Sequence, residues 1–351
     1  MPRVVGIDPG TVSIDVCGLD DGRVVLDRAW PTAEALADAD RFATYLRSAG
    51  EPRLVAGLSG YGLPLVAADG ATEADWRLAF LAGPGDEGGI GGLRRLTRQL
   101  SAAKLPLVFL PGVVHLDTVP AHRKLNRVDL GTADKVSVAA LAIDEQSNRL
   151  GLDVRETSLV VLELGGAFSS ALAVAQGRIV DGLGGTSGPI GWRAAGSLDG
   201  EVAFLAGTLD KTMLFQGGVE SVVATRPDLE SVAFDGFIEG AVKAVHQMFV
   251  SAPNAREIVV SGRRAADSRV RAALSSRLAN LAPIVELRGF ARFAKQGAQG
   301  AALIADGLTG GPHQTLVKAL RLRHASGSVL DHLFVVSPER ARSRLGLGSH
   351  G

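Results

Sequence analysis

The chain has 351 residues, of which 46% are hydrophobic and 21% charged, a length that suggests two domains with buried cores. Lys plus Arg and Asp plus Glu number 37 each, and this balance argues against a nucleic-acid partner bound by a strongly basic surface. No apolar run approaches the roughly 20 residues of a membrane span, and the one cysteine excludes an internal disulfide. We therefore expect a cytoplasmic protein with no membrane partner.

Short apolar runs alternate with longer stretches of helical spacing along the chain. The runs with the length of buried strands are Arg3–Ile7, Leu54–Leu58, Leu105–Leu110 and Ser158–Leu162. Helical spacing is found in Ala33–Ser48 and Ser268–Leu281. Glycine-rich Ala82–Gly92 is expected to be a flexible loop, and the tail after Ser343 to be disordered. Strands mixed with helices predict an α/β fold.

An internal repeat is the most informative feature. When the chain is shifted by 155 residues, Val4–Val25 lies on Leu159–Val180 without a gap. Four residue pairs then coincide: Asp8 with Glu163, Gly10 with Gly165, Gly22 with Gly177, and Arg23 with Arg178. Each copy predicts a strand, a turn with an acid and a glycine, a second strand and a glycine hairpin. Shared apolar alternation of two unrelated hairpins is the weaker explanation, so we infer a duplicated domain.

The two acid–glycine turns are candidate phosphate sites. In the first turn, Asp8 is followed by Pro9 and Gly10 and by the hydroxyls of Thr11 and Ser13. Backbone N–H groups in such turns can receive phosphate oxygens, and a carboxylate can hold hydrated Mg²⁺. An ordinary turn is the simpler reading of either copy alone, whereas the pair at equivalent positions favours a shared polyphosphate ligand.

These residues carry a family resemblance. The Asp8–Ser13 turn and the duplication resemble the superfamily of sugar and acetate kinases, chaperone ATPases and actin. Within it, the stretch from Glu163-Leu164-Gly165-Gly166 to Gly177-Arg178-Ile179-Val180-Asp181 is similar to butyrate and acetate kinases. The sequence also resembles an uncharacterised family of predicted butyrate kinases. The resemblance implies two duplicated ribonuclease-H-like domains around a central nucleotide cleft, and ATP and Mg²⁺ as cofactors.

The resemblance also implies roles for further residues. Asp134 and Lys135 open the segment similar to the first interdomain helix, and a cap with a solvated ion pair is the equally weighted alternative. The turn at Gly262 and Arg263 is similar to the adenosine-binding turn. Gly300 belongs to the segment that resembles the second interdomain helix, where close helix packing is a compatible explanation.

Two domains and an extension are expected on this basis. Residues 1–155 form the N-terminal ribonuclease-H-like domain, and residues 156–310 the C-terminal one with the adenosine-binding turn. Residues 311–351 form a helical extension and the tail. The homodimer common in the resembling kinases is an expectation from the resemblance alone.

The resulting hypothesis is an ATP-dependent kinase of a small carboxylate. Asp8, Glu163, Asp134 and Arg193 are the catalytic candidates, and Asp8 is also the metal ligand. The nucleotide-binding candidates are Gly10, Thr11, Ser13, Gly165, Gly166, Gly262, Arg263 and Gly300. Arg193, or alternatively Arg127, is the candidate for holding the acceptor carboxylate, since Arg pairs with carboxylates in a bidentate manner.

The sequence also departs from the carboxylate kinases. Glu163 stands where they have His, and Leu287–Gln296 contains no acid where they carry a metal-associated Glu. The second hypothesis is therefore an ATP-binding regulatory or assembly module with weak or no phosphotransfer; a sugar kinase is the third. His115 and His122 are seven residues apart, a spacing that indicates core or surface histidines rather than a metal site.

Overall fold

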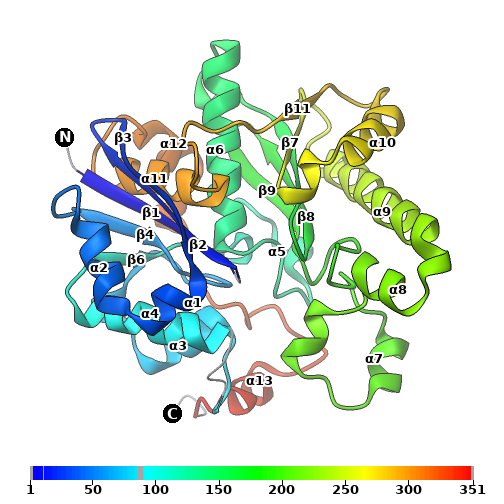
Figure 1. Cartoon of the computed structure of the whole chain (residues 1–351), viewed down its shortest axis with the longest axis horizontal. Coiled ribbons are helices and arrows are strands. Elements are labelled where there is room, and N and C mark those ends of the chain that lie inside the picture. The colour runs from blue at the N-terminus through cyan, green and yellow to red at the C-terminus, as the bar shows by residue number, and fades with distance from the viewer. Residues whose placement is uncertain (1–2, 11, 86–89, 349–351) are drawn as a thin grey trace. The chain divides into compact units, whose positions relative to one another are not determined.

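The computed structural model describes residues 3–10, 12–85 and 90–348 (Figure 1). Thr11 lies outside the described residues, and so does part of the expected loop at 82–92. Contacts between residues divide the chain into two compact units. The first comprises residues 1–128, 132–155 and 288–351, and the second residues 129–131 and 156–287.

The first unit contains a six-stranded sheet in the order β3-β2-β1-β4-β6-β5. Its strands are β1 (Arg3–Pro9), β2 (Ser13–Asp20), β3 (Arg23–Pro31), β4 (Leu54–Gly57), β5 (Val66–Ala67) and β6 (Leu107–Phe109). The first three strands form an antiparallel meander, whereas β4 runs parallel to β1 and β6 parallel to β4. The carboxyl ends of β1, β4 and β6 therefore meet at one edge of the sheet.

Nine α-helices of the described residues belong to the first unit. They are α1 (Thr32–Ala37), α2 (Ala39–Arg47), α3 (Glu73–Phe80), α4 (Ile90–Ala102), α5 (Ala121–Lys124), α6 (Ala133–Leu150), α11 (Gln296–Leu308), α12 (Gln314–Ala319) and α13 (Pro338–Arg344). The single helix predicted for Ala33–Ser48 is wrong, because Asp38 leaves the helical conformation and its carboxylate accepts the Arg41 N–H, starting α2 anew. Phe42 and Leu46 are fully buried.

The expectation of disorder after Ser343 is also wrong for the described part of the tail. Leu347 is 8% exposed, and the guanidinium of Arg77 donates hydrogen bonds to the carbonyls of Leu345 and Gly346 at 2.8 and 3.1 Å. Burial of one leucine and two hydrogen bonds from a charged donor stabilise this end of the chain against α3.

Helix α11 packs directly on the sheet of the first unit because small residues line the contact. A Cβ atom at Gly6 of β1 would lie 2.1 Å from the Ala298 carbonyl oxygen and 2.2 Å from the Ala302 nitrogen. On another side of α11, a Cβ at Gly300 would lie 1.8 Å from the carbonyl oxygen of Ser137 in α6. Glycine is required at both positions by backbone approach alone.

The second unit contains a five-stranded sheet in the order β11-β10-β7-β8-β9. Its strands are β7 (Leu159–Leu164), β8 (Ser169–Ala175), β9 (Arg178–Leu183), β10 (Ile258–Ser261) and β11 (Ile284–Glu286), and its helices are α7 (Gly200–Ala206), α8 (Val219–Thr225), α9 (Glu230–Ser251) and α10 (Ser268–Leu278). Helix α9 supplies much of the core with Phe237, Ile238 and Val245, each 0% exposed. The predicted helix at 268–281 is α10, three residues shorter than expected.

The two sheets repeat the same plan, which confirms the duplication. Each has an antiparallel meander of three strands, and the first strand of each meander also pairs in parallel with the next strand. The hairpins turn through left-handed residues 155 positions apart, Asp21-Gly22 and Gln176-Gly177. The register also shifts at equivalent places, after Gly18 and after Ala173. A register shift preserved at one offset is a stronger sign of common origin than apolar alternation.

The compact units differ from the expected domains in their membership. The chain passes from the first unit to the second between Arg155 and Glu156. Residues 288–310, which we expected in the C-terminal domain, group with the first unit because α11 packs on β1 and α6. Residues 129–131 group with the second unit, where the Asp129 carboxylate accepts hydrogen bonds from the N–H and hydroxyl of Thr186, both at 3.0 Å.

Candidate functional site

The first acid–glycine turn links β1 to β2. Asp8 pairs with Asp15 across the two strands at the end of the ladder. The N–H of Gly10 donates to the Ser13 carbonyl at 2.9 Å, and the Thr32 hydroxyl donates to the Gly10 carbonyl at 2.8 Å. The Gly10 N–H is thus used inside the turn. A Cβ at Gly10 would lie 2.7 Å from the Ser13 carbonyl oxygen, so close backbone approach accounts for a glycine here.

Lys295, the residue before α11, forms an ion pair with a buried carboxylate at this turn. Its Nζ lies 2.8 Å from Asp15 Oδ2 and donates to the Ser13 hydroxyl at 2.7 Å, while its N–H donates to Asp15 Oδ1 at 3.2 Å. Asp15 is 1% exposed, whereas the Lys295 side chain is 49% exposed. The ammonium therefore bridges a buried acid and solvent at the mouth of the turn.

A second ion pair stands at the start of α6. Lys135 Nζ donates to Asp134 Oδ2 at 2.6 Å, and the Thr132 hydroxyl donates to Asp134 Oδ1. Burial opposes ionisation of Asp134, but Lys135 and the Thr132 hydroxyl outweigh it and lower the pKa of this carboxyl. Asp134 is thus a stable anion held by Lys135, and not a solvated residue: these side chains are 27% and 17% exposed.

Asp8 interacts electrostatically with the residues of both ion pairs. Burial, and then the charge of Asp134, raise the pKa of Asp8 from 3.8 to about 7, although Lys295 and Lys135 act in the opposite direction. Its carboxylate also lies against the first turn of α11, since a Cβ at Gly297 would be 2.6 Å from Asp8 Oδ2. A carboxyl that titrates near neutral pH is typical of functional sites.

The second turn has the same local geometry in the second unit. The N–H of Gly165 donates to the Phe168 carbonyl at 2.9 Å, the equivalent of the Gly10 to Ser13 bond. A Cβ at Gly165 would lie 3.9 Å from Glu163 Oε1, so the glutamate side chain stays close to its own turn. Gly166 is exposed, and a Cβ there would meet no atom within 4 Å. The open side of this turn is at Gly166.

The remaining candidates of the second unit are one tightly packed glycine and two exposed arginines. Gly262 has φ +92°, and a Cβ there would lie 2.4 Å from the Leu164 carbonyl oxygen, so backbone approach explains this glycine. Arg263 is exposed next to it. Arg193 lies 3.9 Å from Glu220 with 47% of its side chain exposed, a loose surface pair. Gly300, in the first unit, is likewise explained by its contact with Ser137.

Sequence reasoning missed Lys295 and Asp15. Lys295 stands in a segment that contains no acid, and Asp15 is two residues after Ser13 on the same strand, a spacing that places any two strand side chains on one face. The small number of lysines could have pointed to Lys295. The chain has only seven, and two of them, Lys135 and Lys295, interact electrostatically with Asp8.

The acids near the first turn fit a hydrated Mg²⁺ ion. Within the described part of the chain, no group of three or more His, Cys, Asp or Glu side chains is arranged to hold a metal ion. Mg²⁺ bound to nucleotide phosphates needs only one or two carboxylates, since it retains several waters. The Asp8 carboxylate supplies the hard oxygen ligand that this mode requires, and the residues fit it.

The fold is shared with known kinases. A propionate kinase from Francisella tularensis matches with a TM-score of 0.60 at 14% identity over 86% of this chain and 98% of its own. Acetate kinases from Entamoeba histolytica and Porphyromonas gingivalis match with TM-scores of 0.57 and 0.56 at 12% and 14% identity, over 80% and 86% of this chain and 87% and 98% of theirs. These similarities show that the chain has the fold of these kinases, with two duplicated ribonuclease-H-like domains.

The family of the chain follows from a match to a family model. No curated protein matches the sequence. None of the helices formed by the described residues combines the length and apolar character needed to cross a bilayer. The model of the family described as protein of unknown function DUF1464 matches residues 6–335, and the chain therefore belongs to this family.

Proposed function

We propose that this protein is an ATP-dependent phosphotransferase that converts a small carboxylate to an acyl phosphate, in the manner of butyrate kinase. Support comes from the fold, which it shares with acetate and propionate kinases, and from an acid–glycine turn in each of the two repeated units. In this proposal each turn is an element that binds nucleotide phosphates.

The observation that carries the proposal is the position of Asp8 beside Lys135 and Lys295. Transfer to a carboxylate breaks the bond between the γ-phosphorus and the β–γ bridging oxygen and forms a bond from phosphorus to a carboxylate oxygen. The acceptor is already an anion and ADP leaves with the bridging electrons, so no proton has to be removed. Such a reaction needs alignment and positive charge, which the two lysines supply.

Asp8 has the properties of a group that responds to a cation. With a pKa of about 7 it is partly protonated in the unliganded protein at neutral pH, and a nearby divalent cation favours its ionised form. Asp8 would hold hydrated Mg²⁺, which neutralises charge on the transferring phosphoryl group when bound. Asp134 would fix Lys135, and Glu163 would be the corresponding acid of the second turn.

The other candidates have supporting roles in this proposal. The backbone of Gly166 would contact phosphate at the open side of its turn. The Ser13 hydroxyl would help to position the Lys295 ammonium, from which it accepts a hydrogen bond. Gly262 and Arg263 would lie near the adenosine, and Arg193 would hold the acceptor carboxylate because its pairing with Glu220 is loose.

The runner-up is an ATP-binding module that transfers no phosphoryl group. It is favoured by one observation: the N–H groups of Gly10 and Gly165 are both used inside their turns, which leaves fewer donors to stabilise charge in a transition state. Both proposals predict ATP binding, and they differ in turnover.

A hydroxamate assay for acyl phosphate distinguishes the two. The protein is incubated with Mg-ATP and acetate, propionate, butyrate or isobutyrate, with Asp8→Asn beside the exposed hairpin variant Asp21→Asn as matched control. We expect acyl phosphate with at least one acid, loss of about 100-fold or more in Asp8→Asn, and an unchanged rate in Asp21→Asn. Nucleotide-dependent stabilisation without acyl phosphate from any acid would overturn the kinase proposal.

A further inference from the structure

A cavity of about 400 Å³ lies in the first unit and shares no side chain with the Asp8 site. It is bordered by the loop at residues 62–66, helix α3 and the residues just before it, the short 3-10 helix at Val113–His115, residues 327–329, and Arg342 of α13. Most of its wall is apolar, with Leu63, Pro64, Val66, Leu78 and Val329 among the lining side chains. Its volume is that of a small-molecule site, so a ligand with an apolar body would fit the wall.

His115 is a buried polar group in this wall. It is 2% exposed; its Nδ1 lies 3.3 Å from the Gly112 carbonyl oxygen, and its Nε2 has no hydrogen-bond partner among the described residues. Burial, and to a lesser degree the charge of Lys124, lower the pKa of His115 to about 4, although Gly112 and Asp331 oppose the shift. The imidazole is thus neutral at pH 7, with Nδ1–H donating to Gly112 and Nε2 left as an acceptor.

Arg342 of α13 brings a positive charge to the same wall. Its Nε is buried and has no hydrogen-bond partner among the described residues. A guanidinium left with an unused donor in an apolar wall favours a carboxylate ligand, which it can bind in a bidentate manner.

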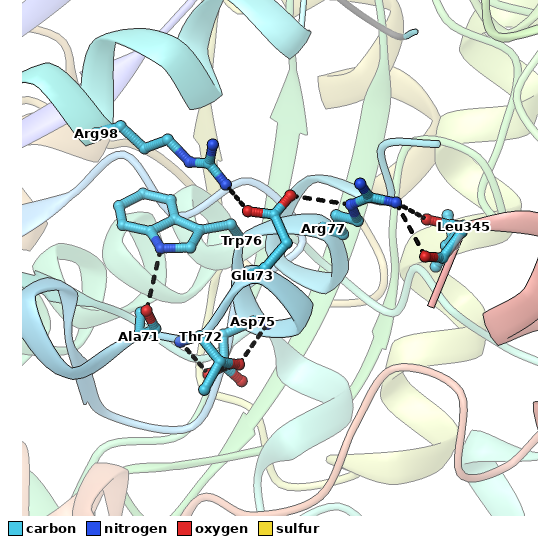
Figure 2. A network of polar contacts seen from close by, with 9 residues as sticks. Ala71, Thr72, Glu73, Asp75, Trp76, Arg77, Arg98 and Leu345 are labelled. Carbon is cyan, nitrogen blue, oxygen red and sulfur yellow. Dashed lines mark hydrogen bonds and ion pairs between the residues drawn. The ribbon is translucent and has the colours of Figure 1, made fainter. Parts of the chain in front are cut away.

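The elements that carry these groups are held in place by their own contacts. Figure 2 shows Arg77 of α3 reaching the Leu345 carbonyl at the end of α13, and also its ion pair with Glu73 at 3.0 Å. The same figure shows the capping box of α3, in which Asp75 Oδ2 accepts the N–H and hydroxyl of Thr72 at 2.8 and 2.7 Å. Asp75 also lines the cavity and adds a negative charge to its wall.

We propose that this cavity binds an amino acid with an apolar side chain. The carboxylate would pair with Arg342, and the ammonium would donate to His115 Nε2, while Asp75 would add negative charge to the same wall. The apolar side chain would contact Leu63 and Val66. Each polar part of such a ligand meets a group of the complementary type, whereas a fatty acid would leave His115 without a donor. The inference is independent of the kinase proposal.

Calorimetric titration of the full chain with four matched probes tests the proposal. The probes are L-phenylalanine, 3-phenyllactate with a hydroxyl in place of the ammonium, 3-phenylpropionate with neither, and L-phenylalaninamide without the carboxylate. We expect phenylalanine to bind at least about tenfold more tightly than each of the other three. Absence of binding of phenylalanine, or equal binding of 3-phenylpropionate, would overturn the proposal.

Variants of Arg342 and His115 test whether phenylalanine binds in this cavity. Arg342→Gln is expected to weaken phenylalanine binding about tenfold or more, and His115→Phe about fivefold or more, at unchanged ATP binding. Arg340→Gln is the matched control, because Arg340 is exposed on the same helix. Equal affinity of Arg342→Gln and Arg340→Gln would contradict this site. If His115→Phe does not fold, as a thermal melt would reveal, the comparison of phenylalanine with 3-phenylpropionate still decides.

Discussion

Lys295 and Asp15 form an ion pair of 2.8 Å that joins the residue before α11 to the turn end of the β1–β2 ladder. The two residues are 280 positions apart in the sequence, and the pair places an ammonium beside the turn that carries Asp8. It therefore has both a structural and an electrostatic consequence, and the two can be separated by mutation.

Lys295→Met is expected to lower the free energy of unfolding by about 1 kcal/mol, because the Asp15 carboxylate loses its cation while Lys295 itself is half exposed. ATP affinity should fall as well, since positive charge is removed from the turn. Chemical denaturation and nucleotide titration measure the two effects. Lys318→Met, a lysine of α12 far along the chain, is the control. A loss of stability without loss of ATP affinity would restrict Lys295 to a structural role.

The raised pKa of Asp8 predicts an unusual dependence of stability on pH. Between about pH 4 and pH 7 the folded protein retains a proton on Asp8 that the unfolded chain releases, so this group lowers stability as pH rises through that window. Asp8→Asn removes the effect. We expect the variant to melt at a higher temperature than the wild type at pH 8, and the difference to vanish near pH 4.

Thermal melts at pH 4.5, 6 and 8 measure the Asp8 effect, with Asp21→Asn as control. The lowered pKa of Asp134 acts in the opposite direction but at more acidic pH, so it does not obscure this window. An Asp8→Asn protein that is less stable than wild type at pH 8 would mean that the carboxylate is stabilised as an anion.

Gly6→Ala is expected to destabilise the first unit by about 3 kcal/mol or more, because the new methyl group would meet the backbone of α11 at 2.1 Å. Gly70→Ala is the matched control, since a Cβ at that position meets no atom within 4 Å. Denaturant unfolding of both variants measures the difference. Equal stability of the two would show that α11 does not rest on β1 as described.

Cys17 reports on opening of the first unit. It is 0% exposed, and burial, together with the charge of Asp27, raises its pKa to about 12. A thiol reagent should therefore modify it only when β1–β3 open, at a rate at least about 1,000-fold below that of the denatured chain. Added Mg-ATP should slow the reaction further if nucleotide binds at the β1–β2 turn. Rapid labelling of the native protein would contradict this burial.

The fold could be predicted from the sequence largely because of the repeat. Because Asp8 matches Glu163 and the hairpin glycines match each other, the repeat predicts the same three-stranded meander in both units, and the sheets have it. The split of Ala33–Ser48 into α1 and α2 was not predicted, because one capping carboxylate at Asp38 outweighs a continuous apolar face. Similarly, Arg77 orders the tail through carbonyl groups, which carry no sequence signal.

The candidate site was predicted in its local parts and not in its long-range ones. Asp8 and Asp134 are acids at element ends, which spacing reveals. Lys295 reaches the same turn from 280 residues away, and only tertiary packing brings it there. Gly262 and Gly300 were assigned to the nucleotide, whereas the approach of Leu164 and Ser137 explains both glycines without a ligand.

Calorimetric titration of Mg-ATP into the wild type, Asp8→Asn, Glu163→Gln and the exposed control Glu201→Gln tests the central claim most directly. If each of the two turns takes part in binding nucleotide phosphates, the wild type binds ATP. Each of the two turn variants then weakens binding about tenfold or more, while Glu201→Gln binds like the wild type. Binding that is unaffected by both Asp8→Asn and Glu163→Gln would contradict the claim.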